Sequence, residues 1–260
     1  MIPRPKRVVD VHYHPAVGSI DGALADARTE RLLRVYPVDR IVASTVGSTF
    51  PTPAEVPLLN DETIRLAKKF SPHVQISCHL NAVHGPDVCL AELDRCLDAG
   101  AVGVKFWMSQ FADDPVVFPI VERCIDLRLP ILVHTGGHGP LGTELQHRET
   151  KPMQTAFLSN RYPEAMIYMA HVGTQWEYGA RALEHAPSLM VDLGGSYTEA
   201  GITERLLKYA DSSRLLFGTD NMSYPSCLAK VTGAGVTGED LERIAWKNAN
   251  RLFRFWPGEL

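Results

Sequence analysis

Two histidines near the N-terminus have a spacing that suggests chemistry. His12 and His14 stand in the apolar run of residues 8–15. Residues two apart share a face of a β-strand, so Asp10 should share a face with both histidines. The opposite face should then hold Val9, Val11 and Tyr13. Two residues of strand span about 7 Å, which lets both imidazoles bind one metal ion. A lone His-x-His pair is weak evidence for a metal site, so the rest of the chain must supply further ligands.

Four more ionisable residues each stand at or near the end of an apolar run that is typical of a buried strand. They are Lys105, His134, His171 and Asp220. In a barrel of parallel strands, the carboxyl ends of all strands meet at one mouth, where the active sites of that fold lie. Burying so many ionisable groups together is costly unless another charge binds them. The combined pattern therefore favours a metal site, with Asp10 one layer deeper as a supporting group rather than a ligand.

Alternating strands and helices must position these residues. After the first strand, β-branched and apolar runs predict strands at 40–46, 74–80, 101–107, 131–134, 165–171, 189–193 and 214–220. Apolar periodicity and capping residues predict helices at 20–35, 60–70, 86–98, 114–129, 152–162, 176–185, 203–210, near 225 and at 239–255. A loop rich in Pro, Ser and Thr at residues 49–57 is expected to cover a pocket.

Eight strand-helix units in strict alternation predict a parallel sheet with right-handed crossovers. We therefore expect one (β/α)8 TIM barrel formed by residues 1–260. An open, doubly wound sheet is the alternative, but residues 14–18, which follow the first strand, lack the glycine-rich phosphate-binding pattern of that fold.

Composition narrows the class of protein. The 260 residues are 45% hydrophobic and 22% charged, with a formal net charge of −4, as in an ordinary globular protein. Nucleic acid and anionic membranes are therefore poor partners, and no apolar run is long enough to span a membrane. The five scattered cysteines are expected to be reduced and buried. With no signal-like segment at the start, a cytoplasmic location is the default expectation. Barrel helices often associate, so a homo-oligomer is an open alternative to a monomer.

The motifs together resemble the amidohydrolase superfamily. They are Asp10-x-His12-x-His14, Gly103-Val104-Lys105, Val133-His134-Thr135-Gly136, Ala170-His171-Val172-Gly173, Phe217-Gly218-Thr219-Asp220 and the run from Lys247 to Phe253. The resemblance is to the amidohydrolase-related branch, which includes small-molecule hydrolases, lactonases and the aminocarboxymuconate-semialdehyde and resorcylate decarboxylases. It spans the whole chain and specifies no substrate.

The resemblance implies a divalent metal ion, with zinc expected first and manganese as the alternative. Its ligands would be His12, His14, His134 and Asp220. Such an ion lowers the pKa of bound water toward about 7 and polarises a carbonyl group. Asp220 would then take the proton of the water, and His171 would orient the carbonyl or donate a proton.

Lys105 has two interpretations. In binuclear relatives the lysine of this strand is carbamylated and bridges two metals, so that a second ion would be held by Lys105, His134 and His171. We favour an ammonium that binds a substrate carboxylate, because an anionic substrate would relieve its desolvation.

Several residues in the loops after strands are candidates for the substrate pocket. Trp107, His138 and Arg148 could contact the substrate, and His79 and His84 are weaker candidates. We expect metal-dependent hydrolysis of a small amide, ester or lactone that carries a carboxylate. The alternatives are non-oxidative decarboxylation of an aromatic or muconate-type acid, and a metal-free lactonase or non-catalytic barrel.

Overall fold

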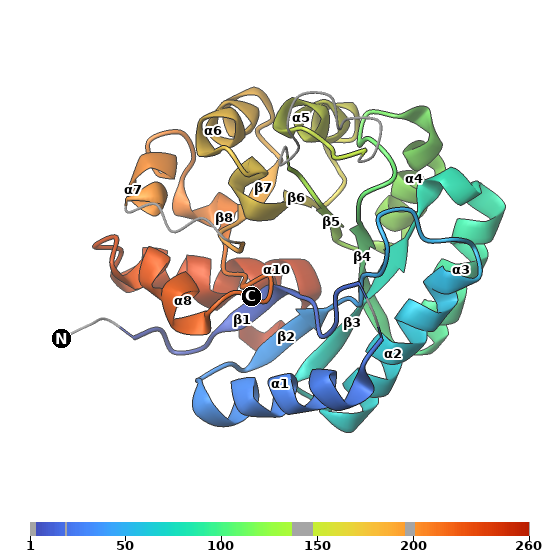
Figure 1. The fold of residues 1–260 in the computed structure, drawn as a ribbon. Helices are drawn as coiled ribbons and strands as arrows, with labels where there is room; N and C mark the ends of the chain where they lie inside the picture. Colours follow the sequence, from blue (N-terminus) through green and yellow to red (C-terminus); the bar gives the residue numbers. More distant parts are fainter. Residues whose placement is uncertain (1–3, 19, 137–147, 196–200, 260) are drawn as a thin grey trace.

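Eight parallel strands form a single sheet surrounded by helices (Figure 1). The computed structural model describes residues 4–18, 20–136, 148–195 and 201–259. The strands follow the chain order: β1 (Val9–Tyr13), β2 (Arg40–Ala43), β3 (Val74–Leu80), β4 (Ala101–Phe106), β5 (Ile131–Val133), β6 (Ile167–Met169), β7 (Met190–Asp192) and β8 (Leu215–Leu216). Backbone hydrogen bonds from Val11 to Phe217 and from Asp220 to His12 join the segment after β8 to β1. The expected (β/α)8 barrel is confirmed.

Each observed helix overlaps a segment that the alternation predicts to be helical, although several ends differ. They are α1 (Gly22–Val35), α2 (Glu55–Lys69), α3 (Pro86–Asp98), α4 (Phe118–Leu127), α5 (Pro152–Arg161), α6 (Trp176–His185), α7 (Ile202–Leu206), α8 (Tyr224–Thr232), α9 (Gly238–Glu242) and α10 (Asn248–Phe253). The helix expected at 239–255 is broken by a π-helical turn, Arg243–Lys247, and ends where Arg254 adopts a left-handed conformation.

The start of α2 corrects the expectation of a helix from residue 60. Thr52 and Glu55 cap each other: the Thr52 hydroxyl accepts from the Glu55 backbone N–H, and the Glu55 carboxylate accepts from the Thr52 backbone N–H at 2.7 Å. This reciprocal pair fixes the turn just before the helix, which begins at Glu55, inside the segment expected to cover a pocket. The remaining loop is held down, because the Ser109 hydroxyl donates to the Thr49 carbonyl.

Strict alternation in β1 is wrong. Val9 and Val11 belong to an inner cluster with Leu132, whereas Tyr13 belongs to the outer cluster that packs against the helices. The pairing of β1 with β2 shifts register between Asp10 and Tyr13, which is the signature of a β-bulge. One extra residue reverses the alternation beyond it.

The C-terminal helices close one end of the barrel. Trp246, Leu252 and Phe253 join Val9 and other inner strand residues in one buried cluster. The guanidinium of Arg7, just before β1, lies 4.1 Å from the ring centre of Trp256, which follows α10. The C-terminal segment therefore lies at the amino ends of the strands. The polar strand-end residues lie at the opposite end of the barrel, at the carboxyl ends of the strands.

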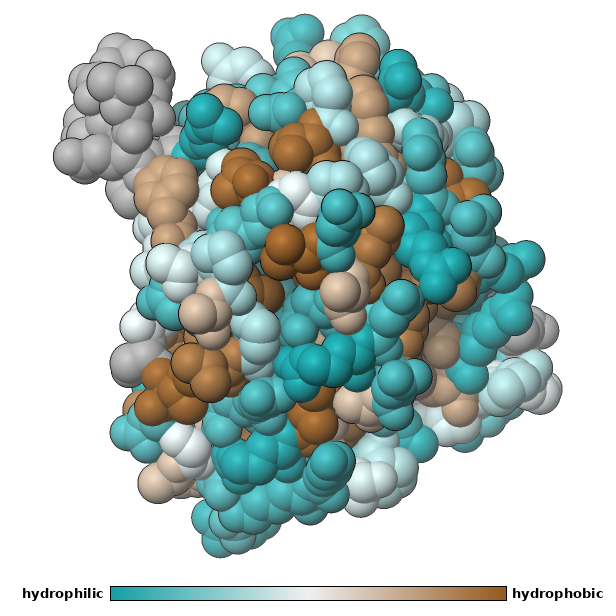
Figure 2. Space-filling model, turned by 90° about the vertical axis from the view of Figure 1, so that its right-hand side faces the viewer, coloured by the Kyte–Doolittle hydropathy of each residue, from teal (hydrophilic) through white to brown (hydrophobic). Residues whose placement is uncertain are grey.

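On the face that Figure 2 shows, hydrophilic side chains surround several separate groups of apolar side chains. All five cysteines are buried and none forms a disulfide. In the described ranges, no helix is both long and apolar enough to cross a membrane.

Candidate metal centre at the mouth of the barrel

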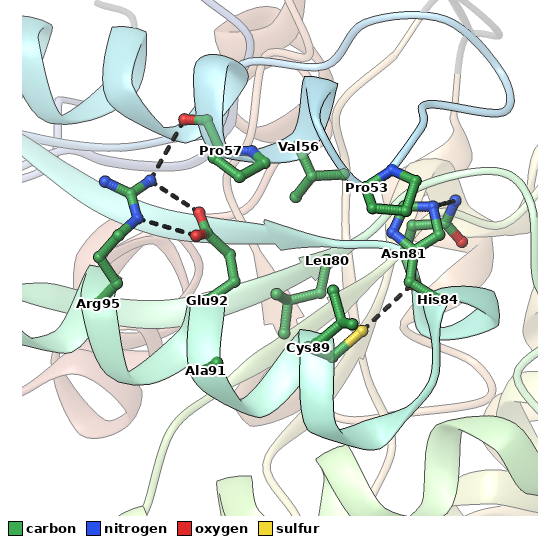
Figure 3. A pocket seen from close by; sticks show the side chains of 11 residues that line it. Pro53, Val56, Pro57, Leu80, Asn81, His84, Cys89, Ala91, Glu92 and Arg95 are labelled. Carbon is green, nitrogen blue, oxygen red and sulfur yellow. Dashed lines mark hydrogen bonds and ion pairs between the residues drawn. The ribbon is translucent and has the colours of Figure 1, made fainter.

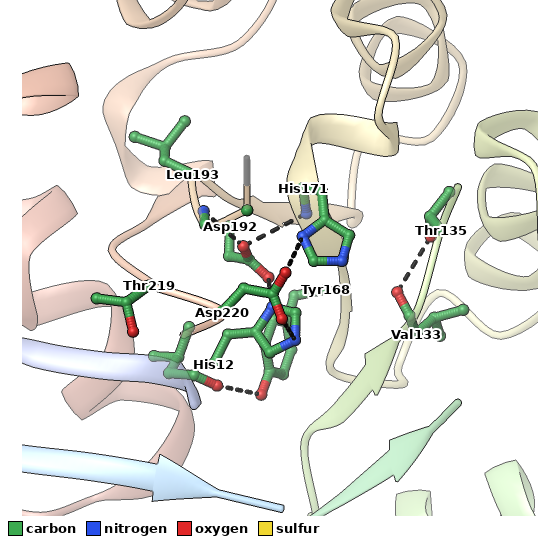
Figure 4. A network of polar contacts seen from close by, with 12 residues as sticks. His12, Val133, Thr135, Tyr168, His171, Asp192, Leu193, Thr219 and Asp220 are labelled. Atoms are coloured by element: carbon green, nitrogen blue, oxygen red, sulfur yellow. Dashed lines mark hydrogen bonds and ion pairs between the residues drawn. The ribbon is translucent and has the colours of Figure 1, made fainter. Parts of the chain in front are cut away.

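The strand-end residues gather at the carboxyl ends of the strands, as the sequence predicts. His12 lies in β1 and His14 directly after it, Lys105 lies in β4, and His171 and Asp220 follow β6 and β8. Figure 4 shows His12, His171, Asp192 and Asp220 pointing toward one another. Both histidines of β1 and Lys105 are buried almost completely.

Donor atoms of the described residues converge in two groups: His12, His171 and Asp192, and His12, His14 and Asp220. The second group contains both histidines of the His-x-His motif. The two Nε2 atoms are 3.0 Å apart, and each lies 3.4 Å from Asp220 Oδ1. One donor atom from each residue lies within 4.8 Å of the others. Nitrogen and carboxylate oxygen donors without sulfur suit zinc or manganese.

The hydrogen bonds of the Nδ1 atoms show which nitrogen of each ring carries the hydrogen. His14 Nδ1 is 2.7 Å from the Ser44 carbonyl, which only accepts, so this nitrogen carries the hydrogen. His12 Nδ1 is 3.1 Å from Asp192 Oδ2 and donates to that carboxylate. In the neutral rings, both Nε2 atoms therefore present lone pairs to each other at 3.0 Å. A cation between them resolves this repulsion, so the residues present fit a metal ion.

Burial keeps both rings neutral. Desolvation, followed by the charge of Lys105, places the pKa of His12 and of His14 well below the ordinary range. Burial also raises the pKa of Asp220 to about 7, against the opposing effect of Lys105. It lowers the pKa of Lys105 to about 8, so the ammonium form prevails at neutral pH. The cluster thus offers uncharged nitrogens beside one buried cation.

His171 is held on a strained turn. It has a φ of 57° and Val172 a φ of 52°, a left-handed conformation that is uncommon for β-branched residues. This turn brings His171 Nδ1 to 3.4 Å from Asp220 Oδ2. A Cβ on Gly195 would lie 2.6 Å from the same Nδ1, so only glycine fits there.

Asp192 is a site residue that the sequence reasoning missed. It ends β7 and is fully buried, and its Oδ1 accepts from the backbone N–H of Gly194 at 2.8 Å. Its Oδ2 accepts from His12 Nδ1, which is the usual way a carboxylate orients a metal-binding histidine. The signal was present in the sequence, since Asp192 is the charged residue of an apolar run, 189–193, that two glycines follow.

Asp10 supports the site from below. Its carboxylate accepts from the Thr219 hydroxyl at 2.6 Å and from the backbone N–H groups of Thr219 and His12. Burial raises the pKa of this carboxyl to about 7. These bonds hold the segment bearing Asp220 against β1, in line with the expected supporting role.

The aromatic wall of the site contains Trp107 and His134. The Trp107 ring centre lies 4.5 Å from that of His134 and 5.7 Å from that of His14, and Lys105 Nζ is 5.5 Å from the Trp107 ring. His134 lies outside the two groups of converging donors, with its ring centre 5.3 Å from that of His171. Its assignment as a ligand, in either metal set, stays a prediction.

The remaining sequence candidates have different surroundings. Arg148 is exposed, with its guanidinium 6.0 Å from the centre of the Phe111 ring, and His138 lies outside the described residues. His84 Nε2 contacts the Pro51 carbonyl at 2.8 Å and so helps to fix the loop before α2. His79 is buried inside the barrel.

A cavity of about 390 Å³ lies between α2 and α3, away from the metal centre (Figure 3). Its walls are mainly apolar, and its charged groups pair with each other. Arg95 donates to Glu92 at 2.8 Å and also contacts Asp61. Because its charges are already satisfied, this cavity offers no unpaired group for chemistry.

Comparison with solved structures shows the fold. The 2,6-dihydroxybenzoate decarboxylase from Rhizobium has a TM-score of 0.74 at 17% identity, covering 95% of this chain and 98% of that one. A dihydroxybenzoic acid decarboxylase from Polaromonas sp. JS666, with bound manganese and 2-nitroresorcinol, has a TM-score of 0.72 at 14% identity, covering 95% and 97%. The 4-oxalomesaconate hydratase LigJ from Rhodopseudomonas palustris has a TM-score of 0.71 at 14% identity, covering 95% of both chains.

A search of curated proteins finds no match. A family model described as amidohydrolase matches residues 9–255, almost the whole chain. The barrel, the strand-end histidines and this match agree, and the chain belongs to the amidohydrolase family.

Proposed function

We propose that this protein is a metal-dependent enzyme that removes carbon dioxide from a small unsaturated or aromatic carboxylic acid. One observation carries the proposal: two proton-free Nε2 atoms lie 3.0 Å apart, with a buried lysine ammonium 3.1 Å from one of them. Two converging lone pairs suit a metal cation, and a buried ammonium suits an anionic partner. Lys105 would bind the carboxylate of the substrate, beside the ring of Trp107.

The metal would be held by His12, His14 and Asp220, with His134 as the fourth ligand. Zinc and manganese both suit these donors. The manganese in the Polaromonas decarboxylase supports including manganese in every test. A second ion, held by a carbamylated Lys105 with His134 and His171, is the alternative arrangement.

The bound metal would act as a Lewis acid that draws electron density from the substrate. As the bond between the carboxylate and the substrate carbon breaks, its electron pair stays on that carbon, and carbon dioxide leaves. The carbon must then gain one proton. Asp220 Oδ2 and His171 Nδ1, 3.4 Å apart, are placed to hold and transfer it. One proton from solvent restores the site.

Hydrolysis of a carboxylate-bearing amide, ester or lactone is the second candidate. Asp220 contacts both Nε2 atoms and His171, so it could equally take a proton from water. The similarity to the hydratase, whose reaction uses water, keeps this candidate in the test. We rank it second because two similar structures are named as decarboxylases.

Product analysis separates the two reactions. Protein loaded with zinc or manganese would be incubated with a panel of hydroxybenzoic and muconate-type acids, lactones and esters. We expect carbon dioxide release from an acid, lost after chelation and restored by added metal. Acid release from a lactone or ester without carbon dioxide would establish the second candidate. Full activity in protein shown to be free of metal would refute both.

Replacement of Asp192 tests the support of His12. In Asp192→Ala, His12 Nδ1 loses its acceptor, and the ring is free to rotate or to change tautomer. We expect metal affinity to fall by about 10- to 100-fold, measured by calorimetry on metal-free protein. Asp94→Asn changes an exposed acid at the surface and serves as the control. Unchanged metal affinity in Asp192→Ala would contradict the orienting role.

A further inference from the structure

His79 is a buried imidazole inside the barrel. Its strand neighbours Ile76, Cys78 and Leu80 belong to the outer cluster that packs against the helices. Successive side chains of a strand point to opposite faces, so His79 points into the barrel. It pairs in register with Lys105 on β4, and its exposed surface is 0%.

Neither ring nitrogen of His79 has a hydrogen-bond partner among the described residues. The backbone of Thr45 is close enough to oppose the fall in pKa, but it makes no contact of hydrogen-bonding geometry. Burial and then the charge of Lys105 lower the pKa of His79 to about 3, so the ring is neutral and keeps one lone pair. An unsatisfied buried polar group is unfavourable, so a second state in which the ring has a partner would be favoured.

Lys105 is the group that could become the partner of His79. Its ammonium lies 3.1 Å from His12 Nε2 and donates to the lone pair of that nitrogen. The same lone pair is the one proposed to bind the metal. Both cannot use it, so Lys105 must find another acceptor when a metal binds.

We propose that His79 is this acceptor: Lys105 turns from His12 Nε2 to a ring nitrogen of His79 when a metal occupies the site. The proposal rests on the metal ligands proposed above. Neighbouring strands are about 4.8 Å apart, and the flexible lysine stem lets its ammonium reach a side chain on the same face. The nearby carboxylates are engaged elsewhere, since Asp192 accepts from His12 and Gly194 and Asp220 would bind the metal. His79 is therefore a positioning residue that holds Lys105 clear of the metal before the substrate arrives.

Metal binding to variants of the full chain tests this role. The probe is zinc or manganese alone, titrated by calorimetry into metal-free protein, with thermal melting measured in parallel. In His79→Leu, Lys105 lacks its second acceptor, so metal affinity should fall by about 10-fold. The metal-free protein should melt at the same temperature or higher, because an unsatisfied buried group is gone. His79→Gln, which keeps an acceptor, should retain affinity to within about 3-fold, and His185→Leu, at an exposed position of α6, should change neither value.

A double-mutant cycle with Lys105→Met isolates the pair. Without the ammonium, His79→Leu should change metal affinity by less than about 2-fold. If the wild-type protein binds no metal, the proposed metal site fails, and this inference fails with it. If the wild type binds metal and His79→Leu binds it equally well, the role of His79 alone is overturned. A lower melting temperature of metal-free His79→Leu with unchanged affinity would also overturn it, by showing a purely structural histidine.

Discussion

Asp220→Asn is expected to lower kcat by about 1,000-fold or more while the protein remains folded. Asp220 contacts His12, His14 and His171, so it joins the metal donors to the group that moves the proton. Asparagine keeps the shape but can neither hold the proton nor bind a cation as strongly. Burial raises the pKa of Asp220 to about 7, so at neutral pH its ionised form lowers the stability of the metal-free fold, and removing the charge should not unfold the protein. Turnover, bound metal and melting temperature would be measured on the same preparation.

Asp87→Asn is the matched control for that variant. Asp87 is an exposed acid in the first turn of α3 and belongs to neither group of converging donors, so the same chemical change there should leave turnover unaltered. Retained turnover in Asp220→Asn would refute the role of this carboxylate in proton transfer. A fall in melting temperature of many degrees would instead show that Asp220 is needed for folding.

The fold and most of the site could be predicted because both follow from periodicity. Each polar residue that closes an apolar run is brought to one mouth when parallel strands close into a barrel. His12, His14, Lys105, His171 and Asp220 meet there for that reason. This inference needs the order of the strands and no detail of any loop.

What could not be predicted depends on local backbone geometry. The β-bulge in β1 turns Tyr13 to the opposite face of the sheet from Val9 and Val11. No residue type in that strand predicts a bulge. The left-handed turn at His171 has no glycine at its two strained positions, so the residue types there do not predict it. Asp192 was missed because its role appears only when barrel closure brings the end of β7 within reach of β1, where it accepts from His12.

Gly179→Ala should disrupt that left-handed turn from the outside. Gly179 lies in α6, and a Cβ there would stand 2.0 Å from the Val172 carbonyl oxygen and 2.8 Å from the carbonyl carbon. Both are backbone atoms, so no side chain can rotate to relieve the clash. Either α6 or the turn must move, and we expect a loss of about 3 kcal/mol in the free energy of unfolding. For a chain of this size, that corresponds to a fall of about 10 °C in melting temperature.

Activity should fall in the same variant, because Val172 directly follows His171. A displacement of about 1 Å at a catalytic group can cost about 100-fold in rate, so kcat should drop by a similar factor even below the melting transition. Gly22→Ala is the matched control, since Gly22 is also helical and a Cβ there meets the Arg65 side chain only at 3.4 Å or beyond. That change should be neutral or slightly stabilising, because alanine favours a helix over glycine. Wild-type melting and turnover in Gly179→Ala would mean that the turn yields without moving His171, and that close packing against α6 does not position this histidine.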